Sequence, residues 1–195
     1  MQKLILPINK AKLTASMKTQ AYLSRFGYVH YGVDMVSTAG DRTLYASGDG
    51  VVLATGKDRV VGRVIAVLYT RALNRTSGGP QDVVLRCFHL EGVQVKPGQR
   101  VNKDTVLGVY GNTGSMSMAY HLHLEADADI AHPLYSPTVL RSDFLRGRAM
   151  GATDSTMHNP LDFLHCKVGP PDNQTYTTAG DIYIKSGDRL IGSVA

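Results

Sequence analysis

Five residues suited to metal binding or proton transfer stand at short spacings in the chain. His30 and Asp34 lie four residues apart in HYGVD, His89 lies in CFHL, and His121 and His123 alternate in HLHLE. Catalytic zinc sites typically combine three protein ligands, drawn from His and carboxylate side chains, with a fourth position for water or substrate. The five residues therefore offer enough nitrogen and oxygen donors for an open zinc site, with histidines to spare.

The HLHLE segment is expected to be a strand with one polar face. Alternate residues of a strand share a face, so the two histidines and Glu125 point one way while the leucines between them enter the core. Same-face neighbours lie roughly 6.5 to 7 Å apart at Cα, so one histidine can bind a metal while the other contacts the water. Taken alone, such a pair is more often two solvated histidines.

The HYGVD segment must bend if both of its polar residues are to bind one metal. An extended chain would separate His30 from Asp34 by roughly 13 Å, whereas zinc ligands lie about 2 Å from the ion. Gly32 is the expected position of the bend, because glycine tolerates backbone angles that other residues avoid. On its own, this spacing is more often coincidence than a site.

His89 is expected at the end of a β-branched strand, with Cys87 on its face and Phe88 on the opposite face. Two roles are open to it. It is either a half-buried histidine with satisfied ring nitrogens, or an acid or base beside the metal, because histidine titrates near neutrality. Cys87 is a less suitable zinc ligand, because the histidines and the aspartate already complete a set.

Composition favours one turn-rich β domain. The 195 residues are 43% hydrophobic, which suffices for a packed core, and include 20 glycines. The net charge of +5 suggests an anionic partner such as a wall polymer, while the lack of a dense Lys/Arg run disfavours nucleic acid. Two cysteines are too few for a disulfide framework. No apolar stretch is long enough for a membrane span, and no signal peptide is recognised.

The pattern of β-favouring runs and turn residues predicts antiparallel strands around the five residues. We expect a hairpin over Tyr45–Ala54 and neighbouring antiparallel strands at Val60–Thr70 and Asp82–Leu90. Residues 1–29 are predicted to be a loop-rich lead-in. Within the irregular stretch 127–158, a short helix is predicted over Thr138–Arg148.

Two further predictions concern the end of the chain. Asn159 and Pro160 predict a capped helical turn, with Asn159 as the N-cap and Pro160 at the first helical position. Residues 169–195 are predicted to be a linker with a small hairpin, or the start of a truncated module. The domain is therefore expected to span 1–168, with a core at 28–126 and a closing segment at 158–166.

The motifs, taken in order, resemble the lysostaphin-type (LytM-like) zinc endopeptidases, which cut peptidoglycan peptides. About half of the chain is covered, and the ordered set is far more specific than any one motif. The matching segments are His-x-Gly-x-Asp at His30–Asp34, Tyr45–Val52, His89–Leu90, Val95–Val101, Leu107–Gly114, His121–Glu125 and the closing Asn159–Leu161.

The resemblance implies roles for all five residues. His30, Asp34 and His123 would bind one Zn²⁺ per chain, and no other cofactor is implied. His89 and His121 would flank the water as general base and transition-state stabiliser, and which takes which role stays open. The implied fold is mainly β: a twisted antiparallel sheet or two-sheet groove, similar to a barrel-sandwich hybrid, with short peripheral helices.

The implied activity is hydrolysis of a peptide bond in the stem peptide or cross-bridge of bacterial peptidoglycan. The protein would act on the bacterial cell wall, whether extracellular, periplasmic or phage-delivered, with peptidoglycan peptides and anionic wall polymers as partners. The chain departs from the family at Cys87, where an aromatic residue is usual, and in the longer insertion 127–158. The missing leader and wall-binding domain suggest a phage-type enzyme or one part of a larger lysin.

Two other functions fit the sequence less well. A catalytically silent relative, which binds wall peptides or activates another hydrolase, would lack metal residues, yet all five are present. A sugar phosphotransferase phosphocarrier domain also carries a His-x-Gly-x-Asp stretch, but it has no need of the HLH strand. The glycines of Gly108–Gly114 lack the Lys-Ser/Thr of a phosphate loop and precede a strand, so we interpret them as a turn.

Overall fold

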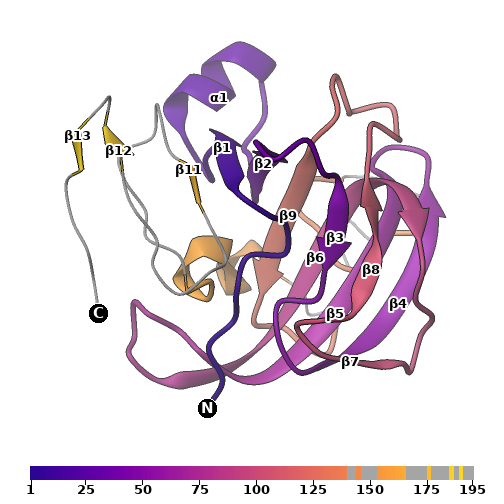
Figure 1. The fold of residues 1–195 in the computed structure, drawn as a ribbon. Helices are drawn as coiled ribbons and strands as arrows, with labels where there is room; N and C mark the ends of the chain where they lie inside the picture. The colour runs from indigo at the N-terminus through magenta and orange to yellow at the C-terminus, as the bar shows by residue number, and fades with distance from the viewer. Residues whose placement is uncertain (140–143, 146–152, 166–174, 177–184, 187–188, 191–195) are drawn as a thin grey trace.

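The protein is described here from a computed structural model that covers residues 1–139, 144–145 and 153–165 with their side chains, and the backbone of 175–176, 185–186 and 189–190 (Figure 1). The elements, in chain order, are β1 Ala11–Ala15, α1 Gln20–Phe26, β2 Val33–Ser37, β3 Thr43–Tyr45, β4 Gly50–Asp58, β5 Gly62–Leu73, β6 Pro80–Val93, β7 Arg100–Val101, β8 Val106–Tyr110, β9 Leu122–Asp127, the 3₁₀ turn η1 Asp154–Thr156, β10 Met157–His158, the 3₁₀ turn η2 Pro160–Asp162, β11 Thr175–Tyr176, β12 Lys185–Ser186 and β13 Arg189–Leu190.

One sheet of eleven strands dominates the fold. Its main path runs β11-β1-β2-β9-β6-β5-β4-β7, with β10 on β9 and with β8 joining β3 to β6. Every pairing between these strands is antiparallel. The single α-helix among the described residues, α1, lies above the ends of β1 and β2 (Figure 1). The prediction of a mainly β, antiparallel fold is confirmed.

Strand β6 changes partner partway along its length. Its first part pairs with β9 as far as Phe88, which lies opposite His123. Its last part pairs with β8 from Leu90, which lies opposite Tyr110. His89 stands between the two parts with a φ of 63°, where the register with β5 also shifts. A β-bulge of this kind bends a strand and redirects a side chain.

Because of the bulge, the side chains of Cys87, Phe88 and His89 do not point in the directions predicted from the sequence. Cys87 packs into the main core, whereas Phe88 belongs to a smaller cluster on the opposite face, with Val61 and Val64. His89 lines the same pocket as Phe88, and Cys87 does not. The prediction that Cys87 and His89 share a face is wrong, and so is the placement of His89 at the end of the strand, because the bulge interrupts the alternation.

The core confirms the alternation predicted for HLHLE. Leu122 and Leu124 are fully buried in the main cluster, while His121 and His123 line the pocket on the other face. The long strands at residues 60–70 and 82–90 are confirmed as the antiparallel pair β5 and β6. Burial of the apolar face thus fixes the direction in which the two histidines point.

The lead-in 1–29 is loop-rich over more than half of its length, as predicted, but it also contains a strand and a helix that the sequence patterns did not indicate. Strand β1 pairs with β2. Thr19 caps the start of α1 by accepting a hydrogen bond from the Tyr22 amide, and Gly27, with a φ of 80°, caps its end. The helix was missed because none of its residues is buried, so it has no apolar period. β1 depends on a partner distant in sequence, which local patterns cannot reveal.

The hairpin predicted over Tyr45–Ala54 is also wrong. Strands occupy both ends, but β3 pairs with β8, and β4 pairs with β5 and β7. The residues between them make long-range contacts, because the Ala46 amide donates to the Thr105 carbonyl and the Ser47 amide to the Tyr69 hydroxyl. The turn residues mark a crossing between parts of the sheet instead of a tight hairpin.

The C-terminal region is described in part. Asn159 caps η2 by accepting a hydrogen bond from the Leu161 amide, with Pro160 at the start, so the predicted capped turn is confirmed. Of the helix predicted over Thr138–Arg148, only residues 138–139 and 144–145 are described, and they are not helical. In the tail, β11 pairs with β1, and β12 pairs with β13.

Candidate metal centre

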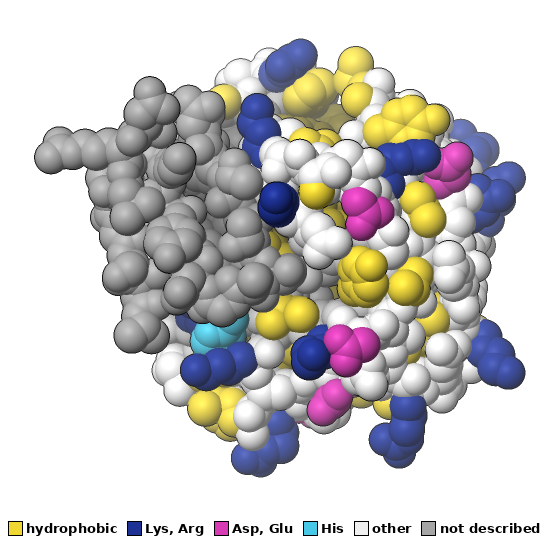
Figure 2. Space-filling view, in the orientation of Figure 1, with side chains coloured by type: hydrophobic (Ala, Val, Ile, Leu, Met, Phe, Trp, Pro, Cys, Tyr) yellow, Lys and Arg dark blue, Asp and Glu magenta, His cyan; other side chains and the backbone are white. Residues whose placement is uncertain are grey.

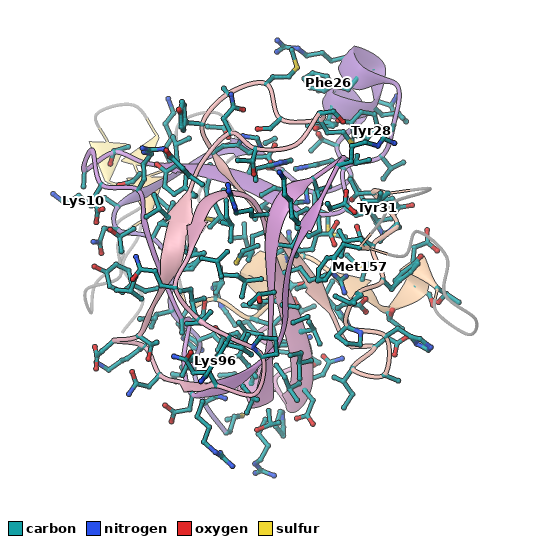
Figure 3. All side chains as sticks on the ribbon, turned by 90° about the vertical axis from the view of Figure 1, so that its right-hand side faces the viewer. Lys10, Phe26, Tyr28, Tyr31, Lys96 and Met157 are labelled. Atoms are coloured by element: carbon teal, nitrogen blue, oxygen red, sulfur yellow. The ribbon has the colours of Figure 1, made fainter. Side chains whose placement is uncertain are left out.

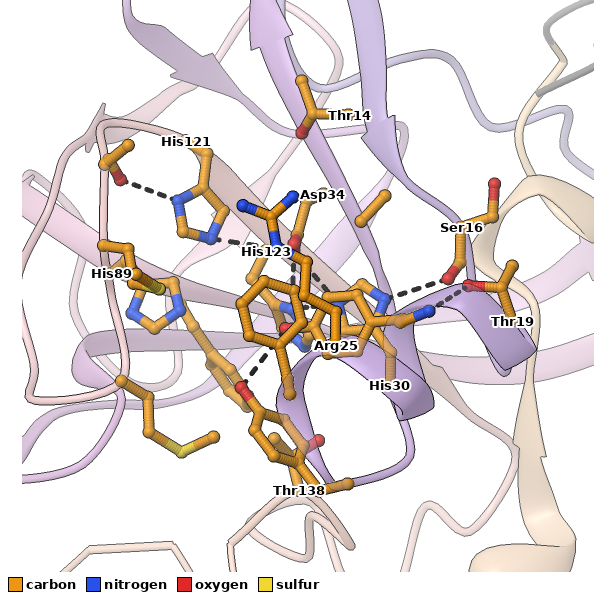
Figure 4. A pocket seen from close by; sticks show the side chains of 18 of the residues that line it. Thr14, Ser16, Thr19, Arg25, His30, Asp34, His89, His121, His123 and Thr138 are labelled. Atoms are coloured by element: carbon orange, nitrogen blue, oxygen red, sulfur yellow. Dashed lines mark hydrogen bonds and ion pairs between the residues drawn. The ribbon is translucent and has the colours of Figure 1, made fainter. Parts of the chain in front are cut away.

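Three of the five candidate residues meet where β2 and β9 pair. Asp34 and His123 lie opposite each other in the register, and His30 lies just before the bend that leads into β2. The distances are 3.1 Å from His30 Nε2 to Asp34 Oδ1, 3.0 Å from His30 Nε2 to His123 Nδ1, and 2.8 Å from His123 Nδ1 to Asp34 Oδ1 (Figure 4). One oxygen and two nitrogens therefore converge on one point.

The bend at Gly32 brings His30 back toward Asp34, as the spacing required. The reason for glycine, however, is close packing, because the φ of Gly32 lies outside the left-handed region. A Cβ at this position would lie 2.4 Å from the Leu124 carbonyl oxygen and 2.7 Å from His123 Nε2. Gly32 thus allows the chain to pass directly over β9 and the ring of His123.

Neighbouring groups fix both imidazole rings. The Nδ1 atom of His30 donates to the Ser16 carbonyl oxygen at 3.1 Å, which leaves Nε2 with its lone pair toward the cluster. Tyr22 stacks on His30, with centroids 4.2 Å apart and planes at 13°, and Phe88 stacks on His123 at 5.1 Å and 10°. A hydrogen bond to the second ring nitrogen and packing on the ring are how proteins orient histidine ligands.

The donor set fits a metal ion. At bond lengths of about 2.0 to 2.1 Å, tetrahedral zinc would hold its ligand atoms about 3.3 Å apart. The three observed separations are 2.8 to 3.1 Å, so the atoms need to move apart by only a few tenths of an ångström. Two imidazoles and one carboxylate also leave a position open, as in catalytic zinc sites. These three residues form the single such cluster among the described residues.

The cluster is buried, and its carboxyl and imidazole groups shift each other's pKa values in opposite directions. His30 and His123 are 1% and 4% exposed, and Asp34 is 9% exposed. Burial opposes ionisation of Asp34, but His123 and His30 outweigh it and hold the pKa of this carboxyl well below its usual range. Burial also opposes protonation of His123, but Asp34 and Glu125 raise its pKa to about 9. The pocket thus attracts a cation, whether a proton or a metal.

His89 and His121 lie beside the cluster, with ring centroids 4.8 Å apart. Each ring donates through Nδ1 to a backbone carbonyl oxygen, His89 to Thr113 at 2.9 Å and His121 to Ala119 at 2.8 Å. Each ring therefore keeps Nε2 free as an acceptor, and that of His121 lies 3.7 Å from Asp34 Oδ1. Burial and the neighbouring His123 and His121 lower the pKa of His89 to about 3, so this ring is neutral.

The turn Gly111–Gly114 supports His89. Besides accepting from the ring, Thr113 donates its amide to the His89 carbonyl and its hydroxyl to the Leu90 carbonyl. A Cβ at Gly62 would lie 2.1 Å from Thr113 Oγ1, and one at Gly114 would lie 2.4 Å from the Gly62 amide nitrogen. These glycines let two turns pack closely enough to hold the bulge that aims His89.

A pocket of about 680 Å³ opens over the cluster. One wall comes from the N-terminal segment, with Tyr22, Arg25, Phe26 and Tyr28, and another from residues 116–121. Figure 4 shows Arg25 and His89 beside the converging donors, and Figure 3 shows Phe26 and Tyr28 at the end of the sheet that carries α1, with Lys96 at the opposite end. The cluster of His30, Asp34 and His123 therefore lies in a pocket with aromatic walls.

Sequence patterns did not single out two contributors to the site. Ser16 acts through its backbone carbonyl, which carries no residue-type signal, and Tyr22 lies on a short helix without an apolar stripe. The Thr19 cap at the start of α1 and Gly27 at its end are local signals that could have revealed this wall.

Comparison with known proteins establishes the class. Residues 28–132, more than half of the chain, match peptidase family M23, and the chain belongs to this family. The resemblance to the lysostaphin-type peptidases is thereby confirmed. Among curated proteins, the peptidoglycan DD-endopeptidase ShyA of Vibrio cholerae is 31% identical over 96 residues, which are 49% of this chain and 20% of ShyA. The aligned region thus spans about a fifth of that relative's length.

Solved structures share the fold. Lysostaphin from Staphylococcus simulans matches with a TM-score of 0.55 and 20% identity, over 83% of this chain and 52% of that one. The SpoIIQ–SpoIIIAH pore-forming complex matches with a TM-score of 0.55 and 18% identity, over 84% of this chain and 92% of that one. Identities this low show likeness of fold alone.

Two further properties concern the helices and the surface charge. No helix among the described residues is long and apolar enough to cross a membrane. The net charge is +5, and on the face shown in Figure 2 the Lys and Arg side chains are dispersed instead of gathered in one patch. This face offers no concentrated basic surface of the kind that tracks a nucleic-acid backbone.

Proposed function

We propose that this chain is a zinc-dependent endopeptidase that hydrolyses a peptide bond in the stem peptide or cross-bridge of bacterial peptidoglycan. Membership of peptidase family M23 supports peptidase activity, and the relative ShyA is named a peptidoglycan DD-endopeptidase. The observation that carries the proposal is the convergence of His30, Asp34 and His123, with two further imidazole Nε2 atoms beside them.

The three converging residues would hold one Zn²⁺ per chain, through His30 Nε2, Asp34 Oδ1 and His123 Nδ1. Zinc bound in such a site polarises a carbonyl group and lowers the pKa of water to about 7. The single carboxylate limits the negative charge of the site, and the surrounding burial strengthens each electrostatic contact. No other cofactor is part of the proposal.

His89 and His121 would accept and donate protons during hydrolysis. Because their Nδ1 atoms are engaged with backbone carbonyls, each presents Nε2 to the pocket. One ring can accept the proton of the attacking water at Nε2 and then pass that proton to the leaving amine, while a ring that carries a proton on Nε2 can donate to the developing oxyanion. The roles of base and transition-state stabiliser belong to His89 and His121 as a pair.

The pocket and the charge support a wall peptide as substrate. The lining of Tyr22, Phe26 and Tyr28 offers apolar area for the peptide backbone and side chains, and the net charge of +5 favours residence on anionic wall polymers. We therefore place the site of action at the bacterial cell wall. We also propose that residues 1–168 form the catalytic domain and that 169–195 are an appendage.

Incubation with purified peptidoglycan of defined cross-bridge type, followed by mass spectrometry of the soluble products, tests the proposal. We expect fragments with a new amino terminus at one peptide bond, loss of cleavage on chelation, and recovery with added zinc. A zinc-loaded protein that binds these walls and cleaves none would instead support a catalytically silent relative. Cleavage that survives complete metal removal would contradict the metal-dependent mechanism.

A further inference from the structure

A buried network of charged side chains lies next to His123, on the side of the ring that faces away from His30 and Asp34. Arg86, Glu125 and Asp127 each have 0% exposure. Arg86 Nε donates to Glu125 Oε2 at 3.0 Å, and Arg86 Nη2 donates to Asp127 Oδ2 at 3.0 Å. The guanidinium also contacts the Pro133 carbonyl oxygen at 3.4 Å and Met157 Sδ at 3.2 Å. One buried guanidinium thus pairs with two buried carboxylates. Its single positive charge offsets only one of their two negative charges.

The second oxygen of Glu125 faces the metal cluster. Oε1 accepts hydrogen bonds from Ser136 Oγ at 2.8 Å and from Thr138 Oγ1 at 2.7 Å. It also lies 3.5 Å from His123 Nε2. That nitrogen is fully buried and has no hydrogen-bond partner within normal distance among the described residues. A buried N–H left unpaired is costly, so the facing carboxylate is the group that can satisfy it.

The orientation of His123 makes this contact relevant to the metal. His123 turns Nδ1 toward His30 and Asp34, so it can bind a cation only with the lone pair on Nδ1 and the proton on Nε2. A negatively charged acceptor beside Nε2 favours this tautomer and increases the basicity of the ligating nitrogen. Arg86 donates to Glu125 Oε2 and the two hydroxyls donate to Oε1, so both oxygens of this side chain act as acceptors.

We propose that Glu125 is a positioning residue that fixes the tautomer and orientation of His123, and that Arg86 and the hydroxyls of Ser136 and Thr138 hold Glu125 in place. The two hydroxyls lie beyond residues 28–132, the region that matches the family. The start of the insertion 127–158 would therefore help to orient His123, because its hydroxyls hold the carboxylate that faces His123 Nε2. This inference rests on the proposed zinc site.

The chain provides a matched control within the same network. Asp127 is as buried as Glu125 and pairs with the same guanidinium at the same distance, but no contact joins it to His123. If the network only stabilised the core, Glu125→Gln and Asp127→Asn would have similar effects. If Glu125 positions His123, the two substitutions would differ in zinc affinity.

The geometry makes Glu125→Gln informative. The amide has one acceptor oxygen, and Arg86 Nε requires it, so the NH₂ group must face the hydroxyls and His123 Nε2. Hydroxyls can rotate to accept, but an NH₂ group opposite Nε2 favours the tautomer with the proton on Nδ1. This substitution should therefore disfavour the ligating form of His123 while nearly preserving the volume of the side chain.

The experiment measures Zn²⁺ affinity by competition with a chromogenic chelator, on wild type and both variants, with circular dichroism of the metal-free proteins as the folding check. We expect Glu125→Gln to bind Zn²⁺ about 10- to 100-fold more weakly than wild type, and Asp127→Asn to stay within about threefold. Equal losses in the two folded variants, or wild-type affinity in Glu125→Gln, would overturn the inference.

A second variant decides the matter if Glu125→Gln does not fold. Ser136→Ala removes one hydroxyl that holds Oε1 and leaves all charges in place. We expect it to weaken Zn²⁺ binding severalfold, and an unchanged affinity would overturn the inference. Absence of Zn²⁺ binding in the wild type would refute the proposed function itself, whereas normal wild-type binding with insensitive variants would refute only the role of Glu125.

Discussion

The sharpest structural prediction concerns Gly32, the residue between two proposed zinc ligands. Substitution of alanine would place a methyl group 2.4 Å from the Leu124 carbonyl oxygen and within 3.0 Å of two atoms of the His123 ring. Real Cβ atoms essentially never approach another atom closer than 3.0 Å, so strand β2 and β9 must move apart by at least about 0.6 Å. This displacement affects backbone pairing and ligand geometry together.

The expected magnitude follows from these contacts. Overpacking in a tight interior typically costs about 1 to 3 kcal/mol, and in a protein of this size each kcal/mol lowers Tm by about 2 to 4 °C. Metal sites tolerate ligand errors of only about 0.2 Å, so a shift three times larger should weaken Zn²⁺ binding at least about tenfold. We therefore expect Gly32→Ala to show both a lower Tm and a lower zinc affinity.

Gly92→Ala is the matched control. Gly92 lies in β6 and its φ, like that of Gly32, is outside the left-handed region, but a Cβ there meets nothing within 4 Å. This substitution should leave zinc affinity unchanged and alter stability by less than about 1 kcal/mol. Calorimetry of the metal-free proteins and chelator competition measure the two quantities separately. Identical values for both variants would refute the reasoning, because only one of the two glycines lies against the metal cluster.

Three further predictions concern single side chains. His89→Ala should retain stoichiometric zinc, measured by metal analysis, while kcat on purified walls falls about 10²- to 10⁴-fold; loss of zinc with activity would show that His89 has a different role. Tyr22→Leu removes the ring stacked on His30 and should weaken zinc binding by up to about 1.5 kcal/mol, and an unchanged affinity would exclude a role for the stack. Burial raises the pKa of the Cys87 thiol to about 12, so a thiol reagent should modify Cys87 only after unfolding; a C166S variant isolates this thiol, and rapid native labelling would contradict its placement in the core.

The features that the sequence could predict are those whose signal is local. The alternation of leucine and histidine in HLHLE set the orientation of both histidines, because one face of β9 must be buried. The four-residue spacing of His30 and Asp34 required a bend, and the bend lies at Gly32. In both cases, the physical constraint acts within a few residues of the chain.

The features that the sequence could not predict depend on contacts between distant segments. The bulge at His89 arises where β6 exchanges β9 for β8, and no local pattern records this exchange. The carbonyl of Ser16 and the ring of Tyr22 reach His30 only because β1 pairs with β2. The sequence places Glu125 on the same face as the histidines, but it does not reveal the ion pair with Arg86, because Arg86 lies 39 residues away in the chain.

Replacement of one proposed ligand tests whether His30, Asp34 and His123 hold a zinc ion that cleavage requires. The decisive measurement is the zinc content of purified His123→Ala beside that of the wild type, with cleavage of the same peptidoglycan preparation recorded in parallel. We expect about one zinc per wild-type chain, and in the variant little zinc and no cleavage, because two of three ligands cannot retain the ion. A His123→Ala protein with a full complement of zinc and full activity would contradict this expectation.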